Sequence, residues 1–242
     1  MEAIRIENLT KKYKDVVAVD GLSLSVEEGE LLSLLGVNGA GKTTTVKMLC
    51  GLTAPTDGDA ILLGHSICKE SLAAKAQLAV SPQETAVAPG LTVRENLALM
   101  CGIHALSREK REARIREMTE LLSLESVIDR KAGKLSGGWQ RRLSIAMAMI
   151  SEPRILFLDE PTLGLDVIAR SELWDRIRAL KGRVTVILTT HYMGEAEALS
   201  DRIAIMKDGR LLLCETAEEI KKRAGTDNFE QAFVQIVKEG RE

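Results

Sequence analysis

The sequence has few cysteines and little net charge. Its cysteines, Cys50, Cys68, Cys101 and Cys214, are widely scattered, without the paired spacing of a zinc site or a redox couple. A disulfide framework would place them more densely, so a reducing compartment fits best. With 33 Lys and Arg against 35 Asp and Glu, the formal net charge is -2. This balance gives no basic field for a phosphate polymer, and nucleic acid is not expected as a partner.

Long apolar runs are also missing. No run reaches the roughly 18 to 20 residues that a membrane-crossing helix needs, and no basic-then-apolar leader opens the chain. We therefore expect a cytoplasmic chain whose transmembrane work, if any, belongs to a partner. The 242 residues are 45% hydrophobic, which is enough for a substantial core in one large domain or two packed subdomains.

Short apolar runs separated by Gly, Asp and Pro predict alternating strands and helices. Residues 3–9 and 16–30 alternate in hydrophobicity and are predicted to form antiparallel strands. The runs that begin at Leu31, Ile155 and Val184 are almost continuously apolar, which is typical of strands buried on both faces of a largely parallel sheet. Residues 202–214 are predicted to form a hairpin that turns at Asp208 and Gly209.

Helical periodicity replaces this pattern between about residues 90 and 150, where apolar residues share one face opposite many charged ones. That face includes Ile115, Met118, Leu121 and Leu122. We expect a helical subdomain inserted in an α/β unit of residues 1–217. Residues 218–242 are expected to form a short helical appendage, with an apolar stripe that packs on the core. The stripe consists of Phe229, Phe233, Ile236 and Val237.

The strongest local pattern is GVNGAGKTT, from Gly36 to Thr44, which lies between a predicted strand and a predicted helix. It fits the P-loop pattern G-x-x-x-x-G-K-[ST], in which glycines turn backbone N–H groups toward phosphate oxygens. The N-terminus of the following helix adds a favourable dipole. We expect Lys42 to reach the β and γ phosphates, and Thr43 to offer its hydroxyl to magnesium. The nucleotide-binding residues expected here are Asn38, Gly39, Gly41, Lys42, Thr43 and Thr44.

Two adjacent acids, Asp159 and Glu160, end the apolar strand that begins at Ile155. The carboxyl ends of parallel strands face the crevice in which open α/β sheets bind ligands. Asp159 can hold magnesium there, directly or through water. Because Pro161 disfavours helix at the residue before it, we expect Glu160 to turn toward solvent in the cleft and act as a general base on water. The alternative is a pair of ordinary acids that cap a strand.

The stretch LSGGWQRR begins at Leu135, and Ser136 followed by two glycines favours the start of a helix. Together with the P-loop and the acidic strand, it resembles the signature motif of the ABC (ATP-binding cassette) ATPases, and the resemblance extends over almost the whole chain. It implies a P-loop NTPase core with a mainly parallel sheet, an N-terminal antiparallel β-subdomain and an inserted α-helical subdomain. Two residues depart from the family pattern: Trp139 is unusually large for the signature, and Val167 stands where a proline often occurs. Neither removes a catalytic group, so they bear on rate or dimer contacts rather than on activity itself.

The resemblance also assigns roles to isolated residues. Tyr13 stands where the family stacks an aromatic ring on adenine; an ordinary surface tyrosine is the alternative. Gln83 matches the glutamine that senses magnesium. Asp166 lies in the loop that crosses to the partner subunit, and His191 matches the switch histidine that contacts the γ-phosphate.

In this family two subunits pair head to tail, so the resemblance implies a homodimer. Ser136, Gly137 and Gly138 of one subunit would enclose the ATP held by the P-loop of the other. The implied reaction is in-line attack of water on the γ-phosphate of MgATP. The expected catalytic residues are Lys42, Glu160 and His191. The residues expected around Mg2+ are Thr43, Gln83 and Asp159.

Residues 190–211 resemble most closely the ATP-binding subunits of bacterial multidrug and antibiotic efflux systems. The implied function is an ATPase that powers export through separate transmembrane permease subunits and is peripheral on the inner face of the membrane. Residues 84–96 could form a rim that holds a permease helix, and a simple packed connector is the alternative. Two alternatives are an ABC ATPase that works without a permease and a regulator with an inactive site. The sequence leaves the transported substrate open, and it favours export over import only by resemblance.

Overall fold

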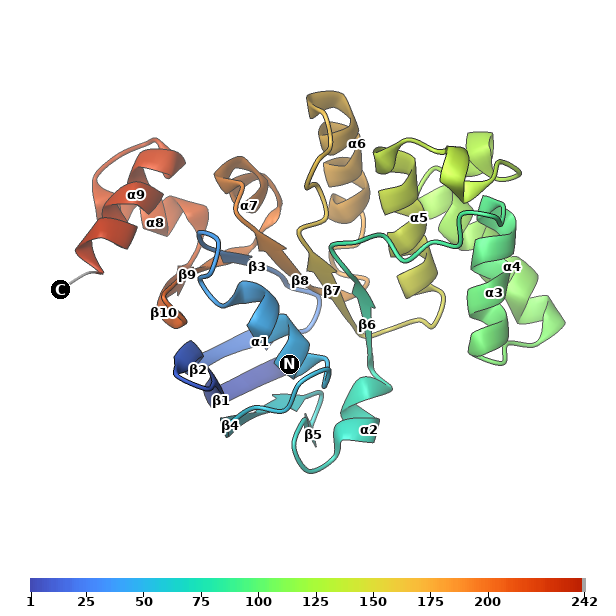
Figure 1. Cartoon of the computed structure of the whole chain (residues 1–242). Coiled ribbons are helices and arrows are strands. Elements are labelled where there is room, and N and C mark those ends of the chain that lie inside the picture. Colours follow the sequence, from blue (N-terminus) through green and yellow to red (C-terminus); the bar gives the residue numbers. More distant parts are fainter. Residues whose placement is uncertain (241–242) are drawn as a thin grey trace.

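The core of the molecule is a six-stranded sheet in the computed structural model, which describes residues 1–240 (Figure 1). Its strand order is β10-β9-β3-β8-β7-β6. All neighbours are parallel except β9 and β10. The strands are β3 (Leu31–Leu35), β6 (Leu78–Ser81), β7 (Ile155–Asp159), β8 (Thr185–Thr190), β9 (Arg202–Lys207) and β10 (Arg210–Glu215). This mainly parallel sheet confirms the predicted α/β fold.

Every residue of β3, β7 and β8 is buried, as their continuous apolar runs predict. The hairpin between β9 and β10 turns at Asp208 and Gly209, with φ of 48° and 79°. Two successive residues with positive φ match the twist of a two-residue hairpin, and this turn was also predicted.

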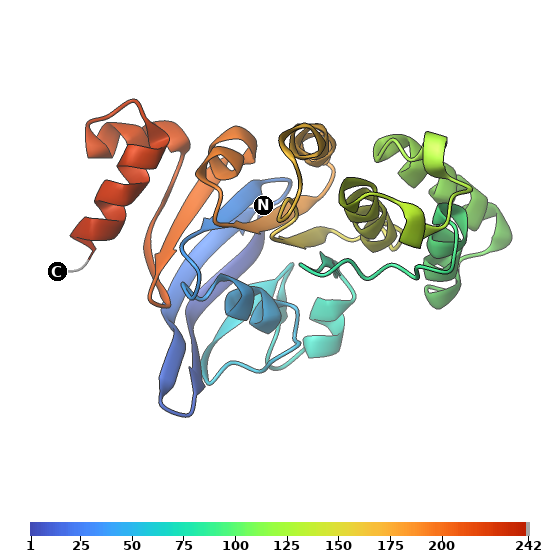
Figure 2. The same cartoon turned by 45° about the horizontal axis from the view of Figure 1, so that its top comes forward.

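A second, antiparallel sheet has the strand order β2-β1-β4-β5. It consists of β1 (Glu2–Tyr13), β2 (Val16–Glu27), β4 (Asp57–Leu62) and the two-residue β5 (His65–Ser66). Helix α1 (Lys42–Leu49) packs its Val46, Met48 and Leu49 into a cluster that contains residues of both sheets. The N-terminal antiparallel region and the central sheet therefore share one core, with α1 in it (Figure 2).

After β6 the chain leaves the sheet, forms a group of helices and returns as β7, which pairs with β6. These helices are α3 (Val93–Ile103), α4 (Arg108–Leu121) and α5 (Gly137–Met149), with 3-10 turns at Glu125–Val127 and Ala132–Lys134. A capping box between Thr92 and Glu95 begins α3. Their apolar faces pack with those of β7 and β8, so the helices share a hydrophobic cluster with the sheet. The short α2 (Ser71–Lys75) precedes β6.

Helices α6 (Val167–Arg178) and α7 (Met193–Leu199) lie next to each other beside the central sheet. The chain ends with α8 (Ala217–Ala224) and α9 (Phe229–Glu239), on the opposite side of the molecule from α3, α4 and α5 (Figures 1 and 2). The predicted apolar stripe of α9 packs on β9 and α8. Lys207 donates to Val237 O at 2.8 Å and thereby ties the end of α9 to the sheet.

Candidate nucleotide-binding site

The P-loop joins the end of β3 to the start of α1 and passes very close to neighbouring backbone. A Cβ atom on Gly36 would lie 2.4 Å from Met206 O, and one on Gly41 would lie 2.6 Å from Ala18 O. Gly41 is also the N-cap of α1, with φ of 99°. Only glycine fits these positions, and because Gly41 has no side chain, the first N–H groups of α1 face the loop without a side-chain cap. Such N–H groups are suited to bind an anion.

Lys42 is buried, and its ammonium points back along the loop. Nζ donates to Gly36 O at 2.7 Å and to Val37 O at 3.2 Å, and it lies 3.7 Å from Glu160 Oε1. Burial lowers the pKa of Lys42, against the opposing effect of the Glu160 and Asp159 carboxylates. A phosphate in the loop could replace the carbonyl oxygens as acceptors and would match the charge of the ammonium.

Asp159 ends β7, and hydroxyls from two other elements donate to it. Its Oδ1 accepts from Thr43 Oγ1 at 3.2 Å and from Thr189 Oγ1 at 2.5 Å. Gln83 lines the same cleft as Thr43. A hydroxyl, a carboxylate and an amide oxygen make up a hard oxygen donor set of the kind that Mg2+ prefers. The residues present therefore fit the predicted ion.

Glu160 adopts a left-handed conformation, with φ of 48°. Its N–H donates to Thr189 O at 3.1 Å and to Thr189 Oγ1 at 3.0 Å, which holds the backbone in place. The side chain lines the cleft, as predicted, but it is only 9% exposed, so the expected turn toward solvent was wrong. The restriction by Pro161 excludes right-handed helix, but the bonds to Thr189 and the charge of Lys42 turn the carboxylate inward.

His191 follows β8 and faces Glu160. Its Nδ1 lies 2.7 Å from Glu160 Oε2. An ionised carboxylate only accepts hydrogen bonds, so Nδ1 carries a proton in this contact and Nε2 is left for another partner. The adjacent strands β7 and β8 thus bring together a carboxylate that can accept a proton and an imidazole that orients it.

A cleft of about 730 Å³ connects these groups. Ten of the predicted site residues line it, namely Tyr13, Asn38, Gly39, Gly41, Lys42, Thr43, Thr44, Gln83, Glu160 and His191. Sequence reasoning missed Val16 and Val17, which are 64% and 42% exposed and extend the apolar rim beside Tyr13. Two consecutive valines after Tyr13 break the alternation of the strand, and this was an available signal. Thr189 was also missed, because nothing distinguishes it in an apolar run.

Other predicted residues lie outside the cleft. Ser136 and Gly137 are exposed, and Ser136 is the N-cap of α5 without a side-chain hydrogen bond. Asp166 is the N-cap of α6, where its Oδ1 accepts from Ala169 N at 2.9 Å. Gly138 packs against α6, since a Cβ there would lie 3.1 Å from Ala169 Cβ. The starts of α5 and α6 therefore form a shared edge that is separate from the P-loop.

Trp139 packs within this edge. The Arg142 guanidinium lies 4.6 Å from its ring centroid, and Arg142 also pairs with Glu172 of α6. The ring thus covers a buried cation that connects α5 to α6. This contact accounts for a large aromatic residue inside the signature.

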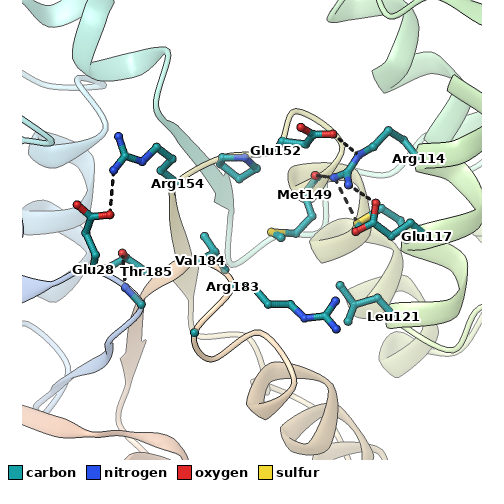
Figure 3. A pocket seen from close by; sticks show the side chains of 14 residues that line it. Glu28, Arg114, Glu117, Leu121, Met149, Glu152, Arg154, Arg183, Val184 and Thr185 are labelled. Atoms are coloured by element: carbon teal, nitrogen blue, oxygen red, sulfur yellow. Dashed lines mark hydrogen bonds and ion pairs between the residues drawn. The ribbon is translucent and has the colours of Figure 1, made fainter. Parts of the chain in front are cut away.

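A second cavity, of about 460 Å³, lies where β7 and β8 begin, at the opposite ends of the strands from the P-loop. Arg114 pairs with Glu117 and Glu152 on one side of it, and Arg154 pairs with Glu28 on the other (Figure 3). Arg183 also lines the cavity, but its three arginines are balanced by Glu28, Glu117 and Glu152, so the cavity lacks the net positive charge of a phosphate site.

Comparison with known proteins agrees with the geometry. Residues 19–163 match the family described as ABC transporter. The Nod factor export ATP-binding protein I of Burkholderia lata is 43% identical over 208 residues, which cover 86% of this chain and 68% of that protein. The probable multidrug ABC transporter ATP-binding protein YbhF of Escherichia coli K12 is 39% identical over 241 residues, covering 97% of this chain and 41% of YbhF.

Solved structures show the same likeness. An ATP-binding subunit of an ABC transporter superimposes with a TM-score of 0.84 at 27% identity and covers 97% of this chain and 99% of that one. A dimeric structure of the ATP-binding cassette MJ0796, bound to ADP and Pi in a post-hydrolysis state, gives a TM-score of 0.78 at 28% identity. It covers 88% of this chain and 98% of the other.

Proposed function

Because this chain belongs to the ABC transporter family and is one of its ATP-binding, ATP-hydrolysing subunits, we propose that it drives export through a transmembrane permease carried on separate chains. The main observation in support of the proposed mechanism of ATP hydrolysis is the placement of Glu160 between Lys42 and His191 at the edge of the nucleotide cleft. A base, a cation and an orienting imidazole meet where a γ-phosphate would end.

In the proposed reaction, the P-loop backbone and Lys42 hold the phosphates of ATP, and Tyr13 stacks on the adenine. Glu160 accepts a proton from the water that attacks the γ-phosphorus in line, and His191 keeps the carboxylate oriented. Thr43, Gln83 and Asp159 would hold Mg2+, which when bound neutralises charge on the phosphate oxygens. Positioning and electrostatics then supply most of the rate enhancement.

A second copy of the chain completes the site in this proposal. Ser136, Gly137 and Asp166 are exposed and lie outside the cleft that contains the P-loop. The dimeric ATP-binding cassette with a similar fold supports a head-to-tail homodimer, in which these residues reach the partner's ATP. Closure would follow ATP binding, and hydrolysis with product release would reopen the dimer.

The export role is supported by the relatives named for Nod factor export and multidrug transport. Within residues 1–240, no helix combines the length and the apolar character needed to cross a membrane. We propose that the chain sits in the cytoplasm, against the inner membrane face, bound to its permease through a rim that includes residues 84–96. In this proposal residues 1–217 are the ATPase domain, with the helical subdomain at about 90–150, and residues 218–242 are an appendage.

Two experiments test the proposal. The substitution Glu160→Gln should leave ATP binding intact and nearly abolish turnover of the purified chain; turnover at the wild-type rate would refute the assigned base. A mild-detergent pull-down of the tagged chain from its native cells should recover a polytopic membrane protein together with ATPase activity. Recovery of water-soluble partners alone, with ATPase activity intact, would instead indicate an ABC ATPase that works without a permease.

A further inference from the structure

Helices α6 and α7 are joined by contacts that repeat at one-turn intervals. The Arg170 guanidinium lies 4.4 Å from the centroid of the Tyr192 ring. One turn further, Trp174 Nε1 donates to Glu195 Oε1 at 3.0 Å. Another turn away, Arg178 Nη2 donates to the carbonyl of Ala198 at 3.4 Å. Residues spaced by four on α6, and by three from Tyr192 at the N-cap of α7 into that helix, occupy one face of each helix, so the contacts fix the register between the helices.

The first of these contacts lies at the reaction site. Tyr192 directly follows His191, and their ring centroids are 4.3 Å apart. Arg170 also donates to Leu165 O at 3.3 Å, in the loop that leads to Asp166. One guanidinium therefore touches both the loop before α6 and the aromatic ring beside the switch histidine.

The second contact is well shielded. Glu195 is 1% exposed, and burial raises the pKa of its carboxyl. Trp174 provides a directional hydrogen bond to this buried group, which anchors α7 one turn after His191. The imidazole of His191 thus sits at the start of a helix that α6 holds in place.

We propose that Arg170 and Tyr192 form a positioning pair that sets the His191 imidazole against Glu160 and couples it to the loop ending at Asp166. This inference rests on the proposed roles of Glu160, His191 and Asp166. Asp166 is exposed on the edge that the proposed second subunit would cover. A push on that loop by the partner moves Arg170, then Tyr192, and so changes the distance between His191 and Glu160. Each subunit thereby senses its partner through its own α6 as well as through the shared nucleotide.

The test compares Arg170→Ala, Tyr192→Leu and the conservative Tyr192→Phe, which keeps the ring. The matched control is Arg178→Ala, which removes a contact between the same two helices at the end far from the site. Steady-state kcat and KM, ATP affinity by fluorescence titration and the thermal midpoint are measured for each. We expect the first two variants to lower kcat by about 10-fold to 100-fold, the size of effect that a small misplacement of a catalytic group produces. Their ATP affinity should stay at the wild-type value.

Tyr192→Phe and Arg178→Ala should keep wild-type kcat. If Arg170→Ala keeps wild-type kcat while Glu160→Gln abolishes turnover, the positioning role is wrong and the proposed function stands. If Glu160→Gln hydrolyses ATP at the wild-type rate, the proposed function is refuted, and the positioning role that rests on it is refuted as well. A merely structural role would lower the thermal midpoint of Arg178→Ala and Arg170→Ala alike and leave kcat of the folded fraction unchanged.

The coupling to the loop has its own test in a double-mutant cycle. Asp166→Asn changes the loop residue but keeps an acceptor for the N-cap of α6. We expect Asp166→Asn to lower kcat in the wild-type chain. In Arg170→Ala it should have little further effect, because the coupling of the Asp166 loop to His191 through Arg170 is already lost. Multiplicative losses in the double variant would show that the loop acts independently of Arg170 and would overturn the coupling.

Discussion

Glu160 Oε2 and His191 Nδ1 lie 2.7 Å apart, at the ends of two strands that are neighbours in the sheet. The contact brings together residues 31 positions apart in the chain. It depends on the pairing of β7 with β8, so the geometry of the proposed catalytic pair is set by the sheet rather than by a loop. Rigid elements hold reacting groups more accurately than loops do.

Replacing the imidazole should therefore impair chemistry rather than binding. We expect His191→Ala to lower kcat by about 100-fold, because the carboxylate loses the group that orients it. The ATP affinity of the variant, measured by titration, should stay close to that of the wild type. His65→Ala is the control, since His65 lies in β5 and does not line the nucleotide cleft. Equal kcat values for His191→Ala and wild type would contradict this role.

Thr189→Val tests the hydroxyl that supports both acids. The variant removes the donor to Asp159 Oδ1 and one acceptor for Glu160 N–H, with little change of shape. Asp159 keeps the Thr43 hydroxyl and Glu160 N–H keeps the Thr189 carbonyl, so the variant loses hydrogen bonds without leaving a group unpaired. A lost hydrogen bond to a charged group costs about 1.5–3 kcal/mol, and urea unfolding should show a loss of that order. We also expect more Mg2+ to be needed for half-maximal ATPase activity.

Thr185→Val supplies the comparison, because the Thr185 hydroxyl accepts from Gly29 N at the other end of β8. It should lower stability and leave the Mg2+ requirement unchanged. The same Mg2+ shift in both variants would argue against a local role for Thr189.

Gly41→Ala should weaken nucleotide binding strongly. The new Cβ would lie 2.6 Å from Ala18 O, and φ of 99° is a conformation that alanine resists. Relief of this clash requires the P-loop to shift, so we expect ATP affinity to fall at least about tenfold, equivalent to ~1.4 kcal/mol. Equilibrium titration of the variant with ATP measures this affinity. Gly90→Ala is the control, since a Cβ there meets nothing within 4 Å; unchanged affinity in Gly41→Ala would refute the prediction.

Glu195 gives a prediction about pH and stability. Burial raises the pKa of its carboxyl in the folded chain above the ordinary value of 4.5. At pH values between 4.5 and this raised pKa, the folded chain therefore binds more protons than the unfolded chain. Stability therefore falls as pH rises through that window. Glu195→Gln keeps an oxygen acceptor for Trp174 but cannot ionise, so its thermal midpoint should fall less than that of the wild type as the pH rises above 4.5.

The control for this measurement is Glu197→Gln, which changes a more exposed carboxylate on the same helix. Its thermal midpoint should follow the pH dependence of the wild type. Parallel curves for Glu195→Gln and wild type would mean that Glu195 does not contribute to the slope.

The sequence predicted the phosphate loop well because every requirement of that loop is local. Gly36, Gly41 and Lys42 stand in fixed spacing between an apolar run and a helical one, and the structure places them between the end of β3 and the first residue of α1. The buried strands and the turn at Asp208 could be predicted equally well, because the hydrophobic pattern and the turn residues occupy consecutive positions in the sequence.

Features that depend on pairing between distant segments were not predictable in this way. Nothing in the run from Thr185 to Thr190 says that it lies between β3 and β7, so the contact of Thr189 with Asp159 was missed. The inward direction of Glu160 has the same origin, because the two bonds that set its backbone come from the neighbouring strand. The contacts of Arg170 with Tyr192 likewise need the register of two helices.

The left-handed backbone of Glu160 has a consequence for protein engineering. A non-glycine residue in that conformation costs about 1–3 kcal/mol, and glycine or asparagine would bear it more easily. A library screened only for heat resistance should therefore be enriched in Glu160→Gly and Glu160→Asn. These more stable variants would lack the proposed general base, so we expect them to have no ATPase activity. At position 160, thermal stability and ATP turnover therefore favour different residues, and glutamate is retained only under selection for activity.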